Sequence, residues 1–132
     1  MKVVVASGKR KTAVARAVAR EGNGRVRINK VPLGVYKPEL LRTMIMEPLL
    51  LIGEKAKQLD IDVNVHGGGI MGQAEASRTA IARAIKQYFE DPEIEKIFKE
   101  YDRTLVVNDV RRKLPKLPMG RGARAKRQKS YR

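Results

Sequence analysis

The stretch IDVNVHGGGIMGQAEASRTAIARAIKQY, residues 61–88, decides the fold. Its first part alternates the apolar Ile61, Val63 and Val65 with polar residues, which predicts a strand with one buried and one wet face. After three glycines, small and apolar residues recur at helical spacing and predict a long amphipathic helix. The stripe on this helix consists of Ile70, Ala74, Ser77, Ile81, Ile85 and Tyr88. The stretch therefore predicts a helix packed on a sheet.

A second alternating run occupies residues 12–21 and indicates an earlier strand. One side of this run consists of Val14, Arg16, Val18 and Arg20. The other side consists of four alanines. Alanine favours helix, but the strict period of two and the Gly22-Asn23-Gly24 that follows favour a strand entering a hairpin.

Further strands are expected around this hairpin. Residues 25–29 form the predicted return strand, with Val26 and Ile28 facing inward. The β-branched run at residues 3–5 predicts a first strand, and residues 7–11 are interpreted as a turn.

Four more elements complete the predicted order. A helix begins near Pro38, and Glu47-Pro48 is expected to end it and start another. Asp91-Pro92 is typical of a helix start, and residues 104–107 predict a last short strand. The polar side chains at residues 25, 27, 62 and 64 would keep one sheet face polar, so we expect the helices on the other face.

The chain ends in a segment without a periodic apolar pattern, residues 110–132. It contains ten Lys and Arg residues and no Asp or Glu, and prolines and glycines interrupt it. Such a segment has little to bury and favours an extended course against a polyanion. We therefore predict a compact domain at residues 1–109 and an extended basic tail at residues 110–132.

The overall charge narrows the classes of partner. The formal net charge is +15, and residues 1–109 still hold 19 basic against 14 acidic residues. Nucleic acid is the expected partner, and a membrane is not, because the tail lacks an apolar anchor. The chain has no cysteine and a single histidine, so we expect no disulfide, metal site, cofactor or catalytic residue. Without a signal-peptide or membrane-spanning pattern, we expect a soluble cytoplasmic protein.

Two glycine-containing stretches offer phosphate sites, and each has a structural alternative. Residues 8–12, GKRKT, fail the Walker pattern because Arg10 stands where Ser or Thr is needed. They are either a solvated basic turn or an RNA-phosphate site extended by Arg16, Arg20, Arg25 and Arg27. Gly67–Gly69 is either a phosphate cradle at a helix N-terminus or a tight strand-to-helix turn.

Other polar positions are interpreted more plainly. His66 is expected at the surface at a strand end, not as a base. Arg78 and Lys86 lie on the polar side of the predicted helix, where solvent or RNA explains them equally well.

Taken together, these motifs resemble the family of small-subunit ribosomal protein S9 over essentially the whole chain. The similar segments are Gly8–Arg16, Gly22–Gly24, Pro32-Leu33, Tyr36, Pro48-Leu49, Gly67–Gly69, Gly72–Ala74, Arg78, Ile81–Ala84 and the ending Lys129–Arg132. The Ser-Tyr-Arg ending is similar to the archaeal and eukaryotic branch of that family.

The resemblance implies an α+β fold of two layers with a mixed sheet, similar to the second domain of ribosomal protein S5, including a left-handed βαβ crossover. It also implies a structural, non-enzymatic place in the head of the small subunit, with ribosomal RNA and neighbouring head proteins as partners and no small-molecule substrate. The tail's end would reach the P-site and contact transfer RNA through Lys129, Ser130 and Arg132.

The residues predicted to contact ribosomal RNA lie in the early strands, the glycine turn, the long helix and the tail. They are Lys9, Arg10, Lys11, Arg16, Arg25, Arg27, Gly67, Gly68, Gly69, Arg78, Arg111, Arg112, Lys113, Lys116, Arg121, Arg124, Lys126 and Arg127. Two other classes compete: an architectural DNA-binding protein, and a phosphotransfer enzyme using the glycine turn. The enzyme lacks a carboxylate pair placed for metal.

Overall fold

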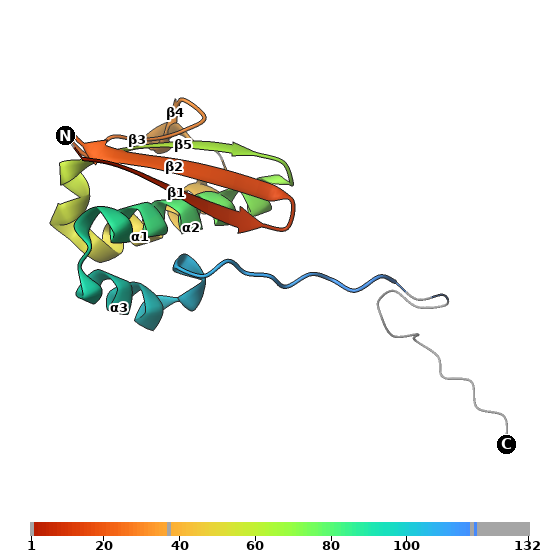
Figure 1. Cartoon of the computed structure of the whole chain (residues 1–132). Coiled ribbons are helices and arrows are strands. Elements are labelled where there is room, and N and C mark those ends of the chain that lie inside the picture. The colour runs from red at the N-terminus through yellow and green to blue at the C-terminus, as the bar shows by residue number, and fades with distance from the viewer. Residues whose placement is uncertain (1, 37, 117, 119–132) are drawn as a thin grey trace, which may run out of the picture.

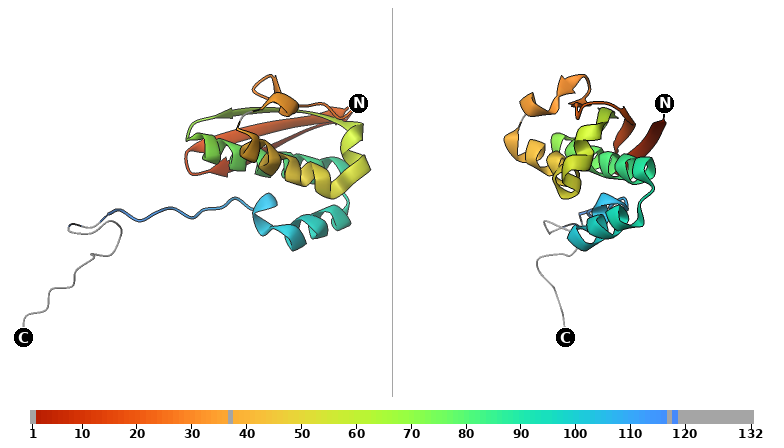
Figure 2. Two further views of the ribbon diagram at one scale, coloured as in Figure 1. Left: turned by 180° about the vertical axis from the view of Figure 1, so that it is seen from behind. Right: turned by 90° about the vertical axis from the view of Figure 1, so that its left-hand side faces the viewer.

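A computed structural model describes residues 2–36, 38–116 and 118. Its sheet has five strands in the order β1-β2-β5-β3-β4 (Figure 1). The strands are β1 Val3–Arg10, β2 Ala13–Glu21, β3 Val26–Ile28, β4 Val31–Pro32 and β5 Leu59–His66. The helices are α1 Glu39–Ile52, α2 Ile70–Phe89 and α3 Pro92–Tyr101. All three helices lie on one side of the sheet, and α3 lies beyond α1 and α2 (Figures 1 and 2).

The sheet is mixed, as expected. β2 pairs antiparallel with both β1 and β5, while β3 pairs parallel with β5. The chain therefore crosses from β3 through α1 to β5. Seen from the helical side with both strands pointing up, β5 lies to the left of β3, so the crossover is left-handed (Figures 1 and 2). About 98% of such crossovers are right-handed, so only the resemblance predicted this hand correctly.

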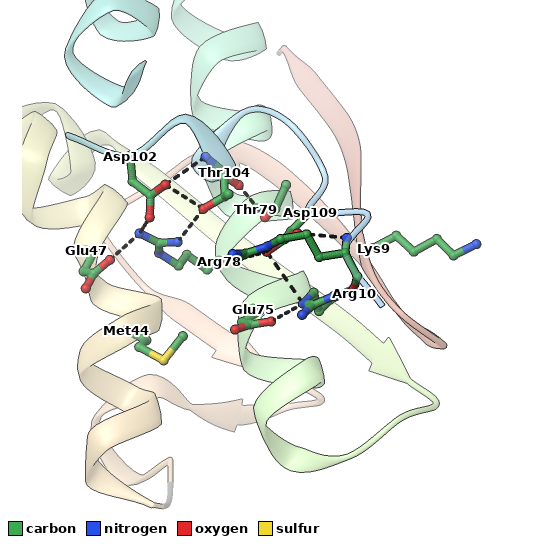
Figure 3. Close-up of a pocket in the computed structure, with 11 residues that line it drawn as sticks. Lys9, Arg10, Met44, Glu47, Glu75, Arg78, Thr79, Asp102, Thr104 and Asp109 are labelled. Atoms are coloured by element: carbon green, nitrogen blue, oxygen red, sulfur yellow. Dashed lines mark hydrogen bonds and ion pairs between the residues drawn. The ribbon is translucent and has the colours of Figure 1, made fainter. Parts of the chain in front are cut away.

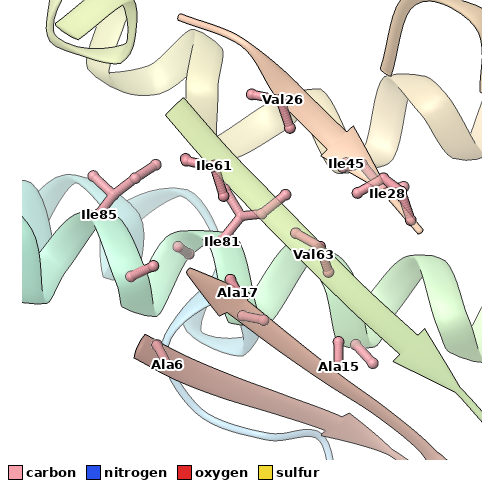
Figure 4. Packing of buried hydrophobic residues seen from close by; sticks show 14 of the residues in the cluster. Ala6, Ala15, Ala17, Val26, Ile28, Ile45, Ile61, Val63, Ile81 and Ile85 are labelled. Atoms are coloured by element: carbon pink, nitrogen blue, oxygen red, sulfur yellow. The ribbon is translucent and has the colours of Figure 1, made fainter. Parts of the chain in front are cut away.

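Alanine is the commonest residue in the core between sheet and helices, beside isoleucine, leucine and valine (Figure 4). Ala13, Ala15, Ala17 and Ala19 of β2 are fully buried. Five alanines of α2 face the same core and are equally buried, at positions 74, 76, 80, 82 and 84. Small side chains on both elements let the helix approach the sheet closely, because little side-chain volume separates the two backbones.

The closest approach is at Gly8. A Cβ on this glycine would lie 2.3 Å from the Ala76 carbonyl oxygen and 2.7 Å from the Ala80 nitrogen. Both are backbone atoms of α2 and cannot move aside without shifting the helix. Gly8 is therefore a packing residue inside β1. The predicted turn at residues 7–11 is wrong, since β1 continues to Arg10 and the chain turns only at Lys11 and Thr12.

The predicted hairpin between β2 and β3 is also wrong, because β5 lies between these two strands. The loop at residues 22–24 instead folds over the beginning of β5. The Asp60 carboxylate accepts hydrogen bonds from the backbone nitrogens of Asn23 and Arg25, each at 3.0 Å. These bonds hold the pKa of Asp60 below its ordinary value. The glycines after β2 therefore mark a loop that is held by the distant strand β5, not the tight turn of a hairpin.

Two boundaries differ from expectation. The first predicted helix does not end at Pro48, since α1 runs through it to Ile52. The Pro48 ring is fully buried, and this packing offsets the missing backbone hydrogen bond. The predicted last strand at residues 104–107 is instead a short 3-10 turn, Arg103–Leu105, because Asp102 caps it by accepting from the Thr104 nitrogen. Burial of Val26 and Ile28 is confirmed.

Candidate nucleic-acid interface

The side of the sheet that no helix covers is charged, but most of its charges are paired. Asp62 on β5 accepts from the Arg27 Nε at 2.8 Å and also forms an ion pair with Arg20. The hydrogen bond from Arg27, followed by the charges of Arg27 and Arg20, holds the pKa of Asp62 below its ordinary value. Arg27 therefore faces outward as predicted, but it already has a carboxylate partner.

Arg16 differs from its neighbours on this face. It lies directly across from Asn64 in the β2–β5 register and has no side-chain partner within the described residues. Val14, Arg16, Asn64 and His66 line a shallow hollow of about 240 Å³. The end of the open sheet face therefore presents an unpaired guanidinium beside an amide and an imidazole.

The glycine turn lies at the same end of the molecule. Gly67 and Gly68 have φ values of +79° and +65°, which favour glycine. A Cβ on Gly67 would lie 2.5 Å from the Thr12 carbonyl oxygen, so the turn rests directly on the β1–β2 turn. These constraints explain Gly67 and Gly68 by packing alone, whereas a Cβ on Gly69 would meet no atom within 4 Å. The same packing brings the N-terminus of α2, which begins after Gly69 without a side-chain cap, against the residues around the β1–β2 turn.

A third segment joins this end, because the extended chain after α3 runs out beside the β1–β2 turn (Figure 1). The Arg112 guanidinium donates to the Lys11 carbonyl oxygen at 3.3 Å. Lys9, Lys11 and Arg112 line a small hollow of about 130 Å³ with Asn108, Asp109 and Val110. We call Lys9, Lys11, Arg16, Arg112 and the turn at residues 67–69 the basic corner. The structure thus brings together residues that lie more than a hundred positions apart.

Arg78 belongs to a different environment, a polar cavity of about 280 Å³ between α1, α2 and the chain after α3 (Figure 3). Only 7% of its surface is exposed. Its guanidinium contacts Glu47 at 2.6 Å and Asp102 at 3.0 Å, and it donates to Thr104. The solvated helix face expected for Arg78 is therefore wrong, because its side chain is buried and bonded to protein groups.

Arg10 lines the same cavity from β1 (Figure 3). Its Nε donates to Glu75 at 2.7 Å and lies 4.0 Å from Asp109, while its NH1 donates to the Arg111 carbonyl oxygen at 2.6 Å. Arg111 in turn forms a bidentate pair with Asp109. The hydrogen bonds from Arg111 hold the pKa of Asp109 far below its ordinary value. These four charges form one continuous network.

The remaining predicted positions divide by location. The Arg25 side chain has no hydrogen-bond partner among the described residues, and Lys113 and Lys116 are exposed in the extended segment. Six charged candidates and Ser130 lie outside the described residues: Arg121, Arg124, Lys126, Arg127, Lys129 and Arg132.

Sequence reasoning missed the acids that neutralise the inner arginines: Glu47, Glu75, Asp102 and Asp109. No local pattern indicates these pairs, because the partners are brought together only by folding. Asn64 and His66 could have been found, since they alternate with buried residues on a strand beside Arg16.

The described residues contain neither a membrane-spanning helix nor a cluster suited to a metal ion. No helix there combines the length and apolarity needed to cross a membrane. No group of three or more His, Cys, Asp or Glu side chains there is arranged to hold a metal ion.

The fold and the basic corner define a small basic α/β protein with a cluster of unpaired cations at one end of the part that the structure describes. The family model described as ribosomal protein S9/S16 matches residues 8–132. The chain belongs to this family, as its motifs indicated, and the family is one of structural ribosomal proteins that is not known to be enzymatic.

Three curated relatives illustrate the similarity, and each is named small ribosomal subunit protein uS9. The protein from Thermoplasma acidophilum is 64% identical over 129 residues, covering 98% of this chain and all of the relative. The one from Picrophilus torridus is 57% identical over 98% of this chain and 97% of its own. The one from Methanothrix thermoacetophila is 53% identical over 132 residues and covers both chains completely.

Proposed function

We propose that this protein is a structural component of the small ribosomal subunit, in the cytoplasm, that binds ribosomal RNA through the basic corner and the tail. The observation that supports this most directly is the segregation of cations. Inner arginines such as Arg10 and Arg78 have carboxylate partners, whereas Arg16 and the Lys9 and Lys11 side chains have none among the described residues. Unpaired cations beside an uncapped helix N-terminus suit RNA phosphates.

The tail supplies most of the remaining charge. Residues 111–127 are proposed to anchor on ribosomal RNA in the subunit head, and Lys129, Ser130 and Arg132 to contact the transfer RNA in the P-site. This assignment rests on the family and on the tail's composition: Arg donors suit phosphates, and a hydroxyl adds a further donor. Neighbouring head proteins are the other proposed partners.

The proposed division of the chain can also be refined. The division predicted from sequence places the end of the compact domain at residue 109. Arg111 and Arg112 nevertheless bond to Arg10 and Lys11 of the β1 end. We therefore propose that the folded unit extends through Arg112 and that the free tail begins after it.

Co-sedimentation tests the proposal against its alternative. Tagged protein expressed in cells should migrate with small ribosomal subunits and be released from RNA by rising salt, because about ten phosphate contacts would make affinity steeply salt-dependent. An architectural DNA-binding protein would instead remain with chromosomal DNA after ribonuclease treatment. Recovery with DNA, or affinity that is insensitive to salt, would contradict the ribosomal proposal.

The transfer RNA contact needs its own test. Subunits assembled with a protein lacking residues 129–132 should sediment normally but bind P-site transfer RNA more weakly than subunits with the full chain. The matched control replaces Lys113 and Lys116 with Gln, which removes two tail charges while retaining the end. Equal transfer RNA affinity in all three preparations would exclude a role for the last four residues.

A further inference from the structure

The chain after α3 follows β1, which is an edge strand of the sheet. We call residues 102–112 the strap. Its contacts occur in step with β1: Arg83 donates both to the Val106 carbonyl oxygen at 3.0 Å and to the Ser7 carbonyl oxygen at 2.9 Å. The Asn108 side chain accepts from the Lys9 nitrogen at 3.1 Å, and Arg112 donates to the Lys11 carbonyl oxygen.

These contacts meet the end of β1 and the turn after it at every second residue. Alternate residues of an edge strand direct their backbone groups away from the sheet. Ser7 and Lys9 are two such positions in β1, and Lys11 follows in the β1–β2 turn; at each of the three, a side chain bonds to one backbone group. The strap therefore lies along the last residues of the edge without adding a strand, which hinders pairing with another chain there.

The strap is also attached at both ends by ion pairs. At its beginning, Asp102 and Thr104 are held by Arg78. Near its end, Asp109 makes the bidentate pair with Arg111 and lies 4.0 Å from the Arg10 Nε, which Glu75 orients at 2.7 Å (Figure 3). Asp109 is the last acid of the chain and is mostly buried, with 14% of its side chain exposed.

We propose that the strap is a guide that fixes where the basic tail leaves the body, and that Asp109 is its positioning residue. With Asp109 in place, Arg111 and the Arg10 side chain hold the last residues of the strap beside the β1–β2 turn. The tail then begins next to Lys11 and the glycine turn, so its charges extend the basic corner. The benefit for RNA binding rests on the proposed function, whereas the geometry of the guide does not.

The direct test measures where the tail begins in the free, full-length protein. The chain has no cysteine, so Glu54→Cys and Lys113→Cys can be spin-labelled without background. We expect a narrow distance distribution in the otherwise unchanged protein, and a much broader one after Asp109→Asn or Asn108→Ala. The control Glu93→Gln removes an equal charge from the exposed start of α3 and should leave the distribution narrow. Circular dichroism checks that each variant is folded.

A broad distribution in the parent, or one that stays narrow after Asp109→Asn, would overturn the guide, whatever the protein binds. RNA binding then provides a second readout, for which the change in charge and the loss of the guide predict opposite results. Asp109→Asn makes the protein more positive, so electrostatics predicts tighter binding. Loss of the guide predicts binding to small-subunit RNA that is weaker by roughly threefold to tenfold, because the segment must then be ordered on binding. Tighter binding would contradict the positioning role.

Discussion

The polar cavity around Arg78 and the basic corner are neighbours, since Lys9 lines a hollow in each, and they contain the same types of cation. In the cavity, each guanidinium faces carboxylates from other elements: Arg78 faces Glu47 and Asp102, and Arg10 faces Glu75. At the corner, Arg16 has no such partner among the described residues. The difference shows that net charge does not identify binding residues, because in the folded protein some cations are paired with carboxylates and others remain free.

The largest expected effect comes from the cavity. Arg78→Ala leaves the partly exposed Glu47 and Asp102 carboxylates without their shared cation, and losing charged contacts of this kind costs about 1.5–3 kcal/mol. Urea denaturation should show this loss of unfolding free energy. Arg103→Ala, at an exposed position one residue from Asp102, is the control and should change stability little. If both variants unfold alike, the cavity has no special structural role.

Acid should weaken the same contacts. The pKa values of Asp62, Asp102 and Asp109 are lowered in the folded protein. Hydrogen bonds from arginine lower the pKa of Asp62 and of Asp109. Burial raises the pKa of Asp102, but hydrogen bonds from Thr104 and Arg78 together outweigh this effect. Their stabilisation is therefore fully present above the ordinary aspartate pKa of about 3.9 and is lost as pH falls through the lowered values.

Urea midpoints should consequently be similar at pH 5 to 7, as far as these carboxylates are concerned, and decrease steadily below about pH 4. The decrease should be smaller in Asp109→Asn, which has one fewer such carboxylate. A parent protein whose midpoint is the same at pH 3 as at pH 6 would contradict this account.

The basic corner should respond in the opposite way. Changing Lys11 and Arg16 together to Gln should leave the unfolding free energy within about 0.5 kcal/mol, since neither side chain has a described partner. RNA affinity should fall, and the slope of log affinity against log salt should decrease by about two, one for each lost phosphate contact. A matched pair of exposed cations elsewhere without a carboxylate partner among the described residues, Lys96 and Arg103, should leave the slope unchanged when replaced by Gln. An unchanged slope in the corner variant would remove Lys11 and Arg16 from the interface.

The smallest effect should come from Asp62→Asn, which converts paired charges into free ones. It releases Arg20 and Arg27 from an exposed ion pair, so stability should fall by less than about 1 kcal/mol. Salt-dependent RNA affinity should rise slightly, as measured by titration at two salt concentrations. An unchanged affinity would mean that this part of the sheet face lies away from RNA.

Much of the fold followed from local patterns. Period-two alternation identified β2 and β5, helical spacing identified α2, and the Asp91-Pro92 start of α3 was also anticipated. Errors arose where a local signal had a distant partner. The glycine loop after β2 resembled a hairpin because nothing nearby indicates that β5 pairs with β2. Gly8 resembled a turn glycine because the α2 backbone against which it packs lies about 70 residues away.

The candidate site was predictable to a similar degree. The residues of the basic corner were singled out from the sequence as a basic, glycine-rich set, and the structure brings them together, but Arg78 was expected on a solvated face. An arginine on a helix has the same spacing whether it faces water or a cavity, so sequence cannot distinguish the two cases. Burial decides the question, and here it is set by α1 and the strap, which approach α2 from remote parts of the chain.

By itself, the sequence determined the layered α+β class, the identity of most strands and helices, the large positive charge and the family, because periodicity, composition and motifs are local properties. Tertiary structure alone decided which cations are neutralised, how the strap follows β1 and where the tail begins. Those properties depend on contacts such as Arg10 with Arg111 and Lys11 with Arg112, each spanning 101 positions in the sequence. Such contacts exist only once the strands, helices and strap have packed together.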